Sequence, residues 1–136
     1  PPNFNANDCS TQRNLDQAGI VQSRMIGNAL KKLGIKFSKI YSSFWCRCKD
    51  TALNMKIGDF EAHEGLNSFY EKHADKKLTL IKLNNLINSF DKLGGPYLLV
   101  THYVNILAFT GLSTSSGGMV AFDLNSQKSI HIKLND

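Results

Sequence analysis

Apolar side chains recur with the spacing of a helix face in two long stretches of the chain. The first is residues 16–33, where Asp16 is suited to cap a helix and Gly34 to end it in the left-handed conformation. Its apolar positions are Ala18, Val21, Met25, Ile26, Ala29, Leu30 and Leu33. The second is residues 74–93, ended by Gly94 and Gly95, with an expected buried face of Leu80, Leu83, Ile87, Phe90 and Leu93. The spacing therefore predicts two long helices, each packed against a core.

Shorter apolar runs predict strands. Ile40 and Tyr41 form a β-prone run, and residues 96–102 form a continuous apolar run that ends in His102, which is typical of a buried parallel strand. A helix over residues 103–109 should follow it. Residues 118–124 and 129–134 predict a closing hairpin, whose alternation places His131 on the solvent face. This order of helices and strands predicts an α/β fold with helices on both faces of a mostly parallel sheet and an antiparallel edge.

The residues after the first strand carry a candidate anion site. Ser42 and Ser43 break the strand run, and Ser43 is a suitable N-cap for a helix through Met55. Arg47 would lie in the first turns of that helix, beside unpaired backbone N–H groups and the positive end of the helix dipole. A guanidinium at a helix start is typical of a phosphate site, although an ordinary surface arginine is the alternative.

His102 stands at the end of the second expected strand. Open α/β sheets place their ligands at the carboxyl ends of their strands, so Arg47 and His102 should converge on one pocket. A histidine there can donate to an anion or shuttle a proton near neutral pH. The alternative is a histidine that only packs at a strand end. The loop 111–118, rich in Gly, Ser and Thr, could border a phosphate but lacks the lysine of a phosphate-binding loop.

Length and composition describe one globular domain spanning residues 1–136. Apolar residues make up 42% and charged residues 20% of the chain, and the net charge is +5. The basic residues are scattered rather than clustered, which does not favour nucleic-acid binding; an anionic small substrate or simple solubility explains the charge equally well. No apolar run approaches the ~20 residues of a membrane span. The three cysteines, Cys9, Cys46 and Cys48, do not form a zinc-binding set.

Three motifs, in order along the chain, resemble the histidine phosphatase (phosphoglycerate-mutase-like) superfamily. They are Leu-Asp-Gln-Ala-Gly at 15–19; Tyr-Ser-Ser-Phe-Trp-Cys-Arg at 41–47 with Asp-Thr-Ala at 50–52; and Leu-Val-Thr-His at 99–102 with Asn-Ile at 105–106 and Thr-Gly at 110–111. The resemblance covers residues 9–124. It implies a three-layer α/β/α sandwich.

The resemblance implies hydrolysis of a phosphomonoester or a phosphohistidine through a phosphohistidine intermediate. Arg47 would clamp the phosphoryl oxygens, His102 would donate to them, and Ser43 would help to bind substrate. Arg13 would complete the site at the pocket rim. Cationic side chains supply the charge that Mg²⁺ supplies elsewhere, so no cofactor is expected. The partner would be a small phosphorylated substrate or a phosphoprotein, with no nucleic acid and no membrane; the oligomeric state stays open.

One departure from the family is large. Members carry an Arg-His motif on a first strand, and its histidine is the nucleophile, but no Arg-His pair occurs in this chain. Residues 1–8, with two prolines, predict a loop rather than that strand. We therefore expect a domain truncated at its N-terminus, inactive as it stands, whose nucleophile strand lies upstream or is supplied by another chain. A non-catalytic phosphate-binding or regulatory protein of the same fold is the alternative.

The resemblance also brings Cys9 near the helix that carries Cys48. A bridge from Cys9 to Cys48, or else to Cys46, would suggest an exported protein, while three reduced thiols would fit the cytoplasm; both compartments stay open. A general acid is expected between residues 56 and 71, which hold Glu61, His63, Glu64 and Glu71. The sequence singles out none of them.

Overall fold

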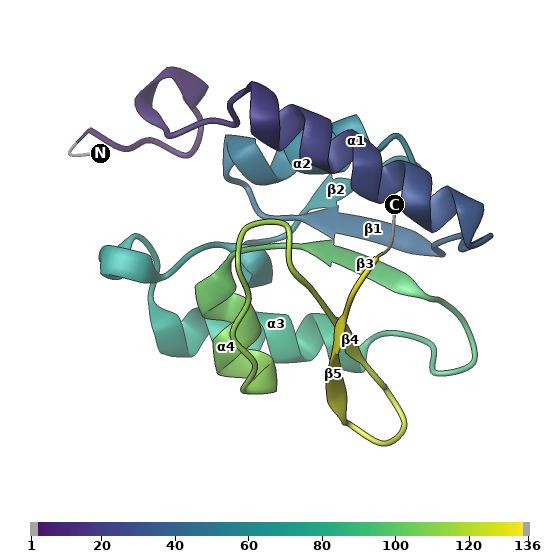
Figure 1. The fold of residues 1–136 in the computed structure, drawn as a ribbon. Coiled ribbons are helices and arrows are strands. Elements are labelled where there is room, and N and C mark those ends of the chain that lie inside the picture. Colours follow the sequence, from purple (N-terminus) through teal and green to yellow (C-terminus); the bar gives the residue numbers. More distant parts are fainter. Residues whose placement is uncertain (1–2, 135–136) are drawn as a thin grey trace.

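The computed structural model describes residues 3–134, which form an α/β fold with two separate sheets (Figure 1). The parallel sheet has the order β2-β1-β3, and a hairpin pairs β4 with β5. The strands are β1 (Lys39–Ser42), β2 (Glu61–Ala62), β3 (Tyr97–Val100), β4 (Met119–Phe122) and β5 (Ser129–Ile132). The parallel core and the hairpin confirm the sequence prediction. The expected single sheet with an antiparallel edge is not formed, because within residues 3–134 no strand joins β3 to β4.

Among the described residues, four α-helices lie on the two faces of the parallel sheet. They are α1 (Gln17–Lys32), α2 (Cys46–Met55), α3 (Lys76–Asn88) and α4 (Tyr103–Thr110), with short 3-10 turns η1 (Cys9–Thr11), η2 (Glu64–Leu66) and η3 (Tyr70–Lys72). Figure 1 shows α1 and α2 on one side of β1 and β3, and α3 and α4 on the other. No helix within residues 3–134 has the length and apolar character needed to cross a membrane.

The core lies under β1, the central strand. Ile40 and Tyr41 are buried, and Tyr41 packs with Leu66, Leu83, Leu86 and Ile87. β1 pairs with β3 from Lys39↔Tyr97 to Ser42↔Val100, so the two strands end at the same level. All four residues of β3 are only half-buried, although the sequence predicted a fully buried strand. The reason is that β3 has a strand on one side alone among the described residues.

Helix α1 begins as predicted but turns a different face to the core. Asp16 caps it by accepting the N–H of Gly19 at 2.8 Å, and Gly34 ends it with φ of 73°. The residues buried on α1 are Ser23, Gly27 and Leu30, whereas Val21 and Met25, predicted to be buried, are 43% and 47% exposed. A Cβ on Gly27 would lie 2.0 Å from the Met55 carbonyl oxygen. This close approach to α2 requires small residues, so it decides which face of α1 is covered.

Helix α3 is shorter than predicted. It ends at Asn88, and Leu93, expected on its buried face, is 98% exposed. The Ser89 hydroxyl donates to the carbonyl of Leu86 at 2.6 Å, which closes the last turn. Phe90 then stacks on Tyr97, with ring centroids 4.0 Å apart. That stacking holds Phe90 on the sheet and stops the helix before the glycines.

Candidate functional site

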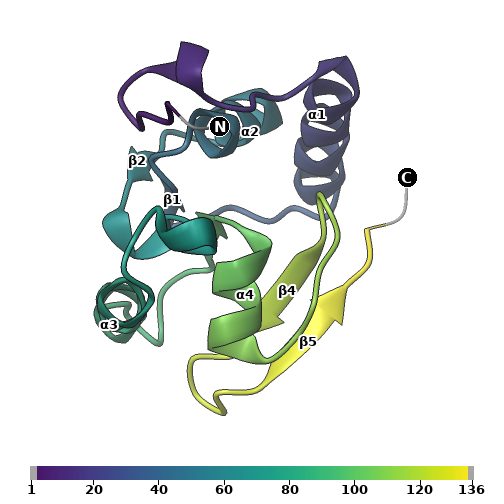
Figure 2. The ribbon, with the colours of Figure 1, turned by 90° about the vertical axis from the view of Figure 1, so that its left-hand side faces the viewer.

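The candidate site lies where β1 and β3 end and the chain enters α2 and α4. Parallel neighbouring strands end at one edge of a sheet, and their ends deliver Arg47 on α2 and His102 just before α4. Arg47 Nη2 lies 3.2 Å from His102 Nδ1. Figure 2 views the molecule from this side, with α2 above and α4 below. The predicted convergence of these two residues is therefore present in the structure.

The start of α2 is shaped by side chains from distant segments. Trp45, rather than Ser43, is the N-cap residue, and the helix ends at Met55 as predicted. The N–H of Phe44 donates to Asn67 Oδ1, and the N–H of Cys46 donates to Gln12 Oε1, both at 2.8 Å. These bonds fix the loop between β1 and α2. They therefore fix the point from which Arg47 projects.

The hydrogen bonds of His102 define its tautomer. A guanidinium can only donate, so Nδ1 of His102 accepts from Arg47 and Nε2 carries the ring proton. That Nε2–H donates to Ser43 Oγ at 2.8 Å. Ser43 also accepts the N–H of Trp45 at 3.1 Å and is fully buried. The structure thus places Ser43 behind His102, where it orients the ring and does not line the cavity.

Burial controls the charge of His102. Its side chain is 6% exposed, and desolvation, with a smaller contribution from the Arg47 charge, lowers its pKa to about 3. The imidazole is therefore neutral throughout the physiological pH range in this structure. Proton shuttling near neutral pH, which the sequence suggested, is not available to His102 in this state. An anion that drew Arg47 away from Nδ1 would favour the protonated ring and change this.

A cavity of about 380 Å³ opens beside Arg47 and His102. Its walls come from α1, α2, β3 and residues 114–119, so the Gly, Ser and Thr loop proposed to border a phosphate does border this cavity. Thr51, Ser68, Tyr70 and Tyr103 add polar groups to the lining. Arg13 is exposed in the segment between η1 and α1 and is not among the lining residues.

Cys48 is a buried thiol inside this site. Its Sγ lies 3.7 Å from His102 Nε2 and 3.8 Å from the carbonyl oxygen of Thr101. Burial raises the pKa of the thiol to about 11, against the opposing effects of the Arg47 charge and the Ser43 hydrogen bond. Cys48 is therefore a neutral packing group rather than a nucleophile at neutral pH. The residues described include no cluster of His, Cys, Asp or Glu that could hold a metal ion.

The other two cysteines form a disulfide, Cys9–Cys46, with Cα atoms 5.7 Å apart. Of the two bridges considered, the preferred one to Cys48 was wrong. Cys46 and Cys48 are two residues apart on α2, which rotates their side chains by about 200° relative to each other. Cys46 faces the N-terminal loop, and Cys48 turns inward to His102. The bridge therefore fastens the loop that carries Arg13 to the start of the Arg47 helix.

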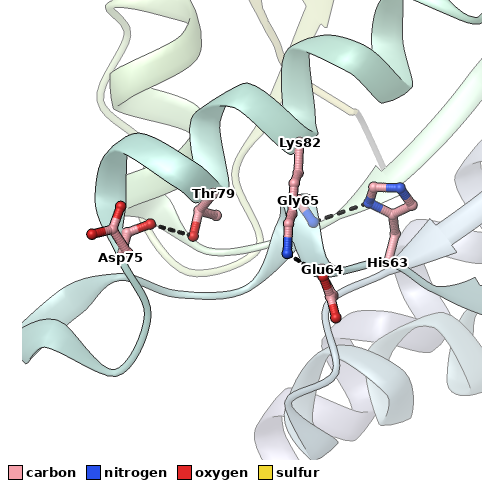
Figure 3. Close-up of polar contacts among 6 residues, drawn as sticks. All are labelled: His63, Glu64, Gly65, Asp75, Thr79 and Lys82. Atoms are coloured by element: carbon pink, nitrogen blue, oxygen red, sulfur yellow. Dashed lines mark hydrogen bonds and ion pairs between the residues drawn. The ribbon is translucent and has the colours of Figure 1, made fainter.

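The stretch expected to hold a general acid contributes little to the cavity. His63 Nδ1 accepts the N–H of Gly65 at 3.0 Å, which begins η2, and Glu64 pairs with Lys82 on α3 (Figure 3). Figure 3 also shows Asp75 and Thr79 joined at the start of α3. The cavity is lined by none of the four candidates, Glu61, His63, Glu64 and Glu71. These contacts are structural, and they leave the general acid unassigned.

Several residues that build the site were not identified from the sequence. Tyr103 could have been found, since it follows His102 directly, and Thr51 lies one helical turn after Arg47 on the same face. Gln12 and Asn67 give no local signal, because each acts on a segment that is distant along the chain. Tyr70 reaches the cavity from the short 3-10 turn η3, in a stretch of the sequence without a regular hydrophobic pattern.

No protein-family model matches this chain, and no curated protein sequence matches it. The candidate site therefore rests on its own geometry and on the ordered motifs of the sequence.

Proposed function

We propose that this chain is part of a phosphatase that hydrolyses a phosphomonoester or a phosphohistidine through a phosphohistidine intermediate. The observation that carries the proposal is the Arg47–His102 pair, joined at 3.2 Å beside a cavity at the carboxyl ends of two parallel strands. The nucleophilic histidine would come from a strand outside these 136 residues. The fold that accompanies this proposal is a three-layer α/β/α sandwich of the histidine phosphatase kind.

Arg47 is the phosphate-binding group in this proposal. Its guanidinium presents paired N–H donors that match two phosphoryl oxygens, and its position in the first turn of α2 adds the helix dipole. In the structure one of these donors rests on His102 Nδ1. A phosphoryl group is a stronger acceptor than a neutral imidazole, so it would take this donor. The negative charge of the phosphoryl group would stabilise a protonated His102. The ring would then donate a hydrogen bond to a phosphoryl oxygen.

For a phosphomonoester, the reaction proceeds in two steps. A histidine nitrogen attacks phosphorus, the P–O ester bond breaks, and the leaving oxygen takes a proton from a general acid that is not assigned. Water then attacks phosphorus and gives a proton back to the group that served as the general acid, the P–N bond breaks, and inorganic phosphate leaves as the histidine is restored. Arg47 and His102 would stabilise the charge that moves onto the equatorial oxygens in both steps.

A non-catalytic phosphate-binding protein is the second candidate. It is favoured by one observation: Arg47 lines the cavity, but the sequence contains no Arg-His pair. The two candidates share Arg47 and differ in turnover. Both lose their basis if the pocket does not bind phosphate.

The test is phosphate binding and hydrolysis with Arg47 variants. We expect Arg47→Ala to weaken phosphate binding roughly 30-fold or more, since charge-assisted hydrogen bonds contribute about 1.5–3 kcal/mol each. Arg47→Lys should recover only part of it, because a lysine cannot form the paired contact. Binding is measured by titration calorimetry. Hydrolysis of a generic aryl phosphate is assayed in a chain to which the proposed Arg-His strand is joined, and turnover that survives Arg47→Ala would reject the proposal.

A further inference from the structure

Two tyrosines of the cavity have no part in the phosphate chemistry. Tyr70 on η3 and Tyr103 at the start of α4 both line the cavity that contains Arg47 and His102. They are 51% and 53% exposed, so they lie where the cavity meets solvent. Their ring centroids are 6.3 Å apart and the rings are tilted by 54°. Two rings from segments more than 30 residues apart in sequence thus form one aromatic edge at the opening.

The same elements that place the anion-binding groups also place these rings. Tyr103 follows His102, whose ring packs edge-on against Trp45 with centroids 5.3 Å apart. The N–H of Tyr70 donates to Ser68 Oγ at 3.2 Å. Glu71 and Lys72 then adopt left-handed conformations, with φ of 52° and 63°. Such conformations are uncommon for residues with a side chain, and this turn sets where Tyr70 stands.

We propose that Tyr70 and Tyr103 bind a planar aromatic ring carried by the phosphate ester, so that the site prefers aryl phosphates. This inference rests on the proposed function, because it assumes that the phosphoryl group binds at Arg47. A ring cannot enter between the two tyrosines, since that needs about 7 Å between parallel faces, two contacts of ~3.5 Å. The substrate ring can instead pack beside the two tyrosines as the third ring of an aromatic cluster. Offset or edge-to-face contacts at about 4.5–7 Å between centroids are the favoured geometry.

Ring planarity and π character are the properties that this edge would recognise. A saturated ring of similar size removes a similar apolar area from water but has no quadrupole to align with the tyrosine rings. We therefore expect phenyl phosphate to bind roughly tenfold tighter than cyclohexyl phosphate. The dissociation constant of inorganic phosphate, which carries no ring, measures the Arg47 contact alone. Comparing it with that of phenyl phosphate separates the contribution of Arg47 from that of the two tyrosines.

The test measures dissociation constants of phosphate, phenyl phosphate and cyclohexyl phosphate by titration calorimetry on the full chain. Tyr70→Leu and Tyr103→Leu remove one ring each and should reduce the preference for phenyl phosphate to under threefold. Tyr70→Phe and Tyr103→Phe are the matched controls. They keep the rings, remove the hydroxyls, and should retain the preference.

Each outcome bears on one proposal. Equal binding of the two esters, or a preference that survives both leucine variants, overturns the aromatic site while phosphate binding continues to support the proposed function. If phosphate and both esters fail to bind, the pocket itself is rejected and this inference falls with it. Loss of the preference in the phenylalanine controls would assign recognition to the hydroxyls and contradict ring stacking.

Discussion

His102 links the chemistry of the site to its stability. Its folded pKa of about 3 lies below the ordinary histidine value of 6.5, so the folded state resists protonation of this ring. The contribution is complete above about pH 6.5 and is lost as the pH falls toward 3. The groups that face it are Arg47 and Cys48 on α2 and Ser43 before α2, and none of them supplies a negative charge.

We expect the free energy of unfolding to fall between pH 6.5 and 4.5 by up to about 1.4 kcal/mol per pH unit from His102 alone. This window lies above the range in which most carboxylates titrate. His102→Gln should flatten the slope, measured by urea unfolding at several pH values. His131→Gln, at an exposed position, is the control and should leave the slope unchanged. Equal slopes in the parent and His102→Gln would contradict the buried neutral state.

At the residue scale, the sequence predicted that Arg47 and His102 meet but not the arrangement around them. Arg47 and His102 could be identified because each follows a recognisable strand. The role of Ser43 as a support for His102, and the binding of Gln12 to the N–H of Cys46, depend on contacts across 59 and 34 residues. No local pattern encodes such contacts.

At the scale of elements, the N-terminal loop depends on the disulfide. The bridge Cys9–Cys46 closes a 37-residue separation, and Phe4 packs on Trp45 with ring centroids 4.7 Å apart. This loop has little other secondary structure, so the bridge and these contacts hold it against α2. Disulfides persist in oxidising compartments, which favours an exported protein.

Reduction should therefore destabilise the protein by about 3–4 kcal/mol, the chain-entropy value for a loop of this length. Thermal unfolding with and without dithiothreitol measures the effect. The Cys9→Ser, Cys46→Ser double variant should unfold at the lower temperature and show no response to reductant. Thiol titration of the unfolded, unreduced protein should find Cys48 alone; three reactive thiols would contradict the bridge.

The elements themselves were well predicted where capping or alternation is local. Asp16, Gly34 and the hairpin pattern gave correct elements, and α4 matches its expected range within a residue. The errors come from tertiary packing. Gly27 turns α1 against Met55, and Phe90 leaves α3 to stack on Tyr97, and neither partner is visible from the helix sequence alone.

At the scale of the whole molecule, β3 and β4 are edge strands of two different sheets that border the same cavity. Within residues 3–134, β3 pairs only with β1, and β4 pairs only with β5. Residues of β3 and β4 line a second cavity, distinct from the one beside Arg47. It also measures about 380 Å³, and its walls are mostly apolar side chains. Asn105, fully buried, also lines it, and its Oδ1 has no hydrogen-bond partner among the described residues. A strand placed between β3 and β4 would join the two sheets, cover this apolar surface and offer N–H donors to both edges.

The last prediction is that a strand carrying an Arg-His motif fits between β3 and β4 and supplies the nucleophile. Each unsatisfied buried peptide group costs on the order of 1–3 kcal/mol, so several at two open edges approach the 5–15 kcal/mol stability of a typical domain. We expect the 136-residue chain to be inactive toward an aryl phosphate and less stable than an extended version to which such a strand is joined. The extended protein should turn over substrate and lose that activity when its motif histidine is replaced by alanine. Thermal unfolding and phosphate release are measured on both proteins. Equal stability with no turnover in either would reject the phosphatase and leave the phosphate-binding candidate, because an anion pocket needs Arg47 but no nucleophile.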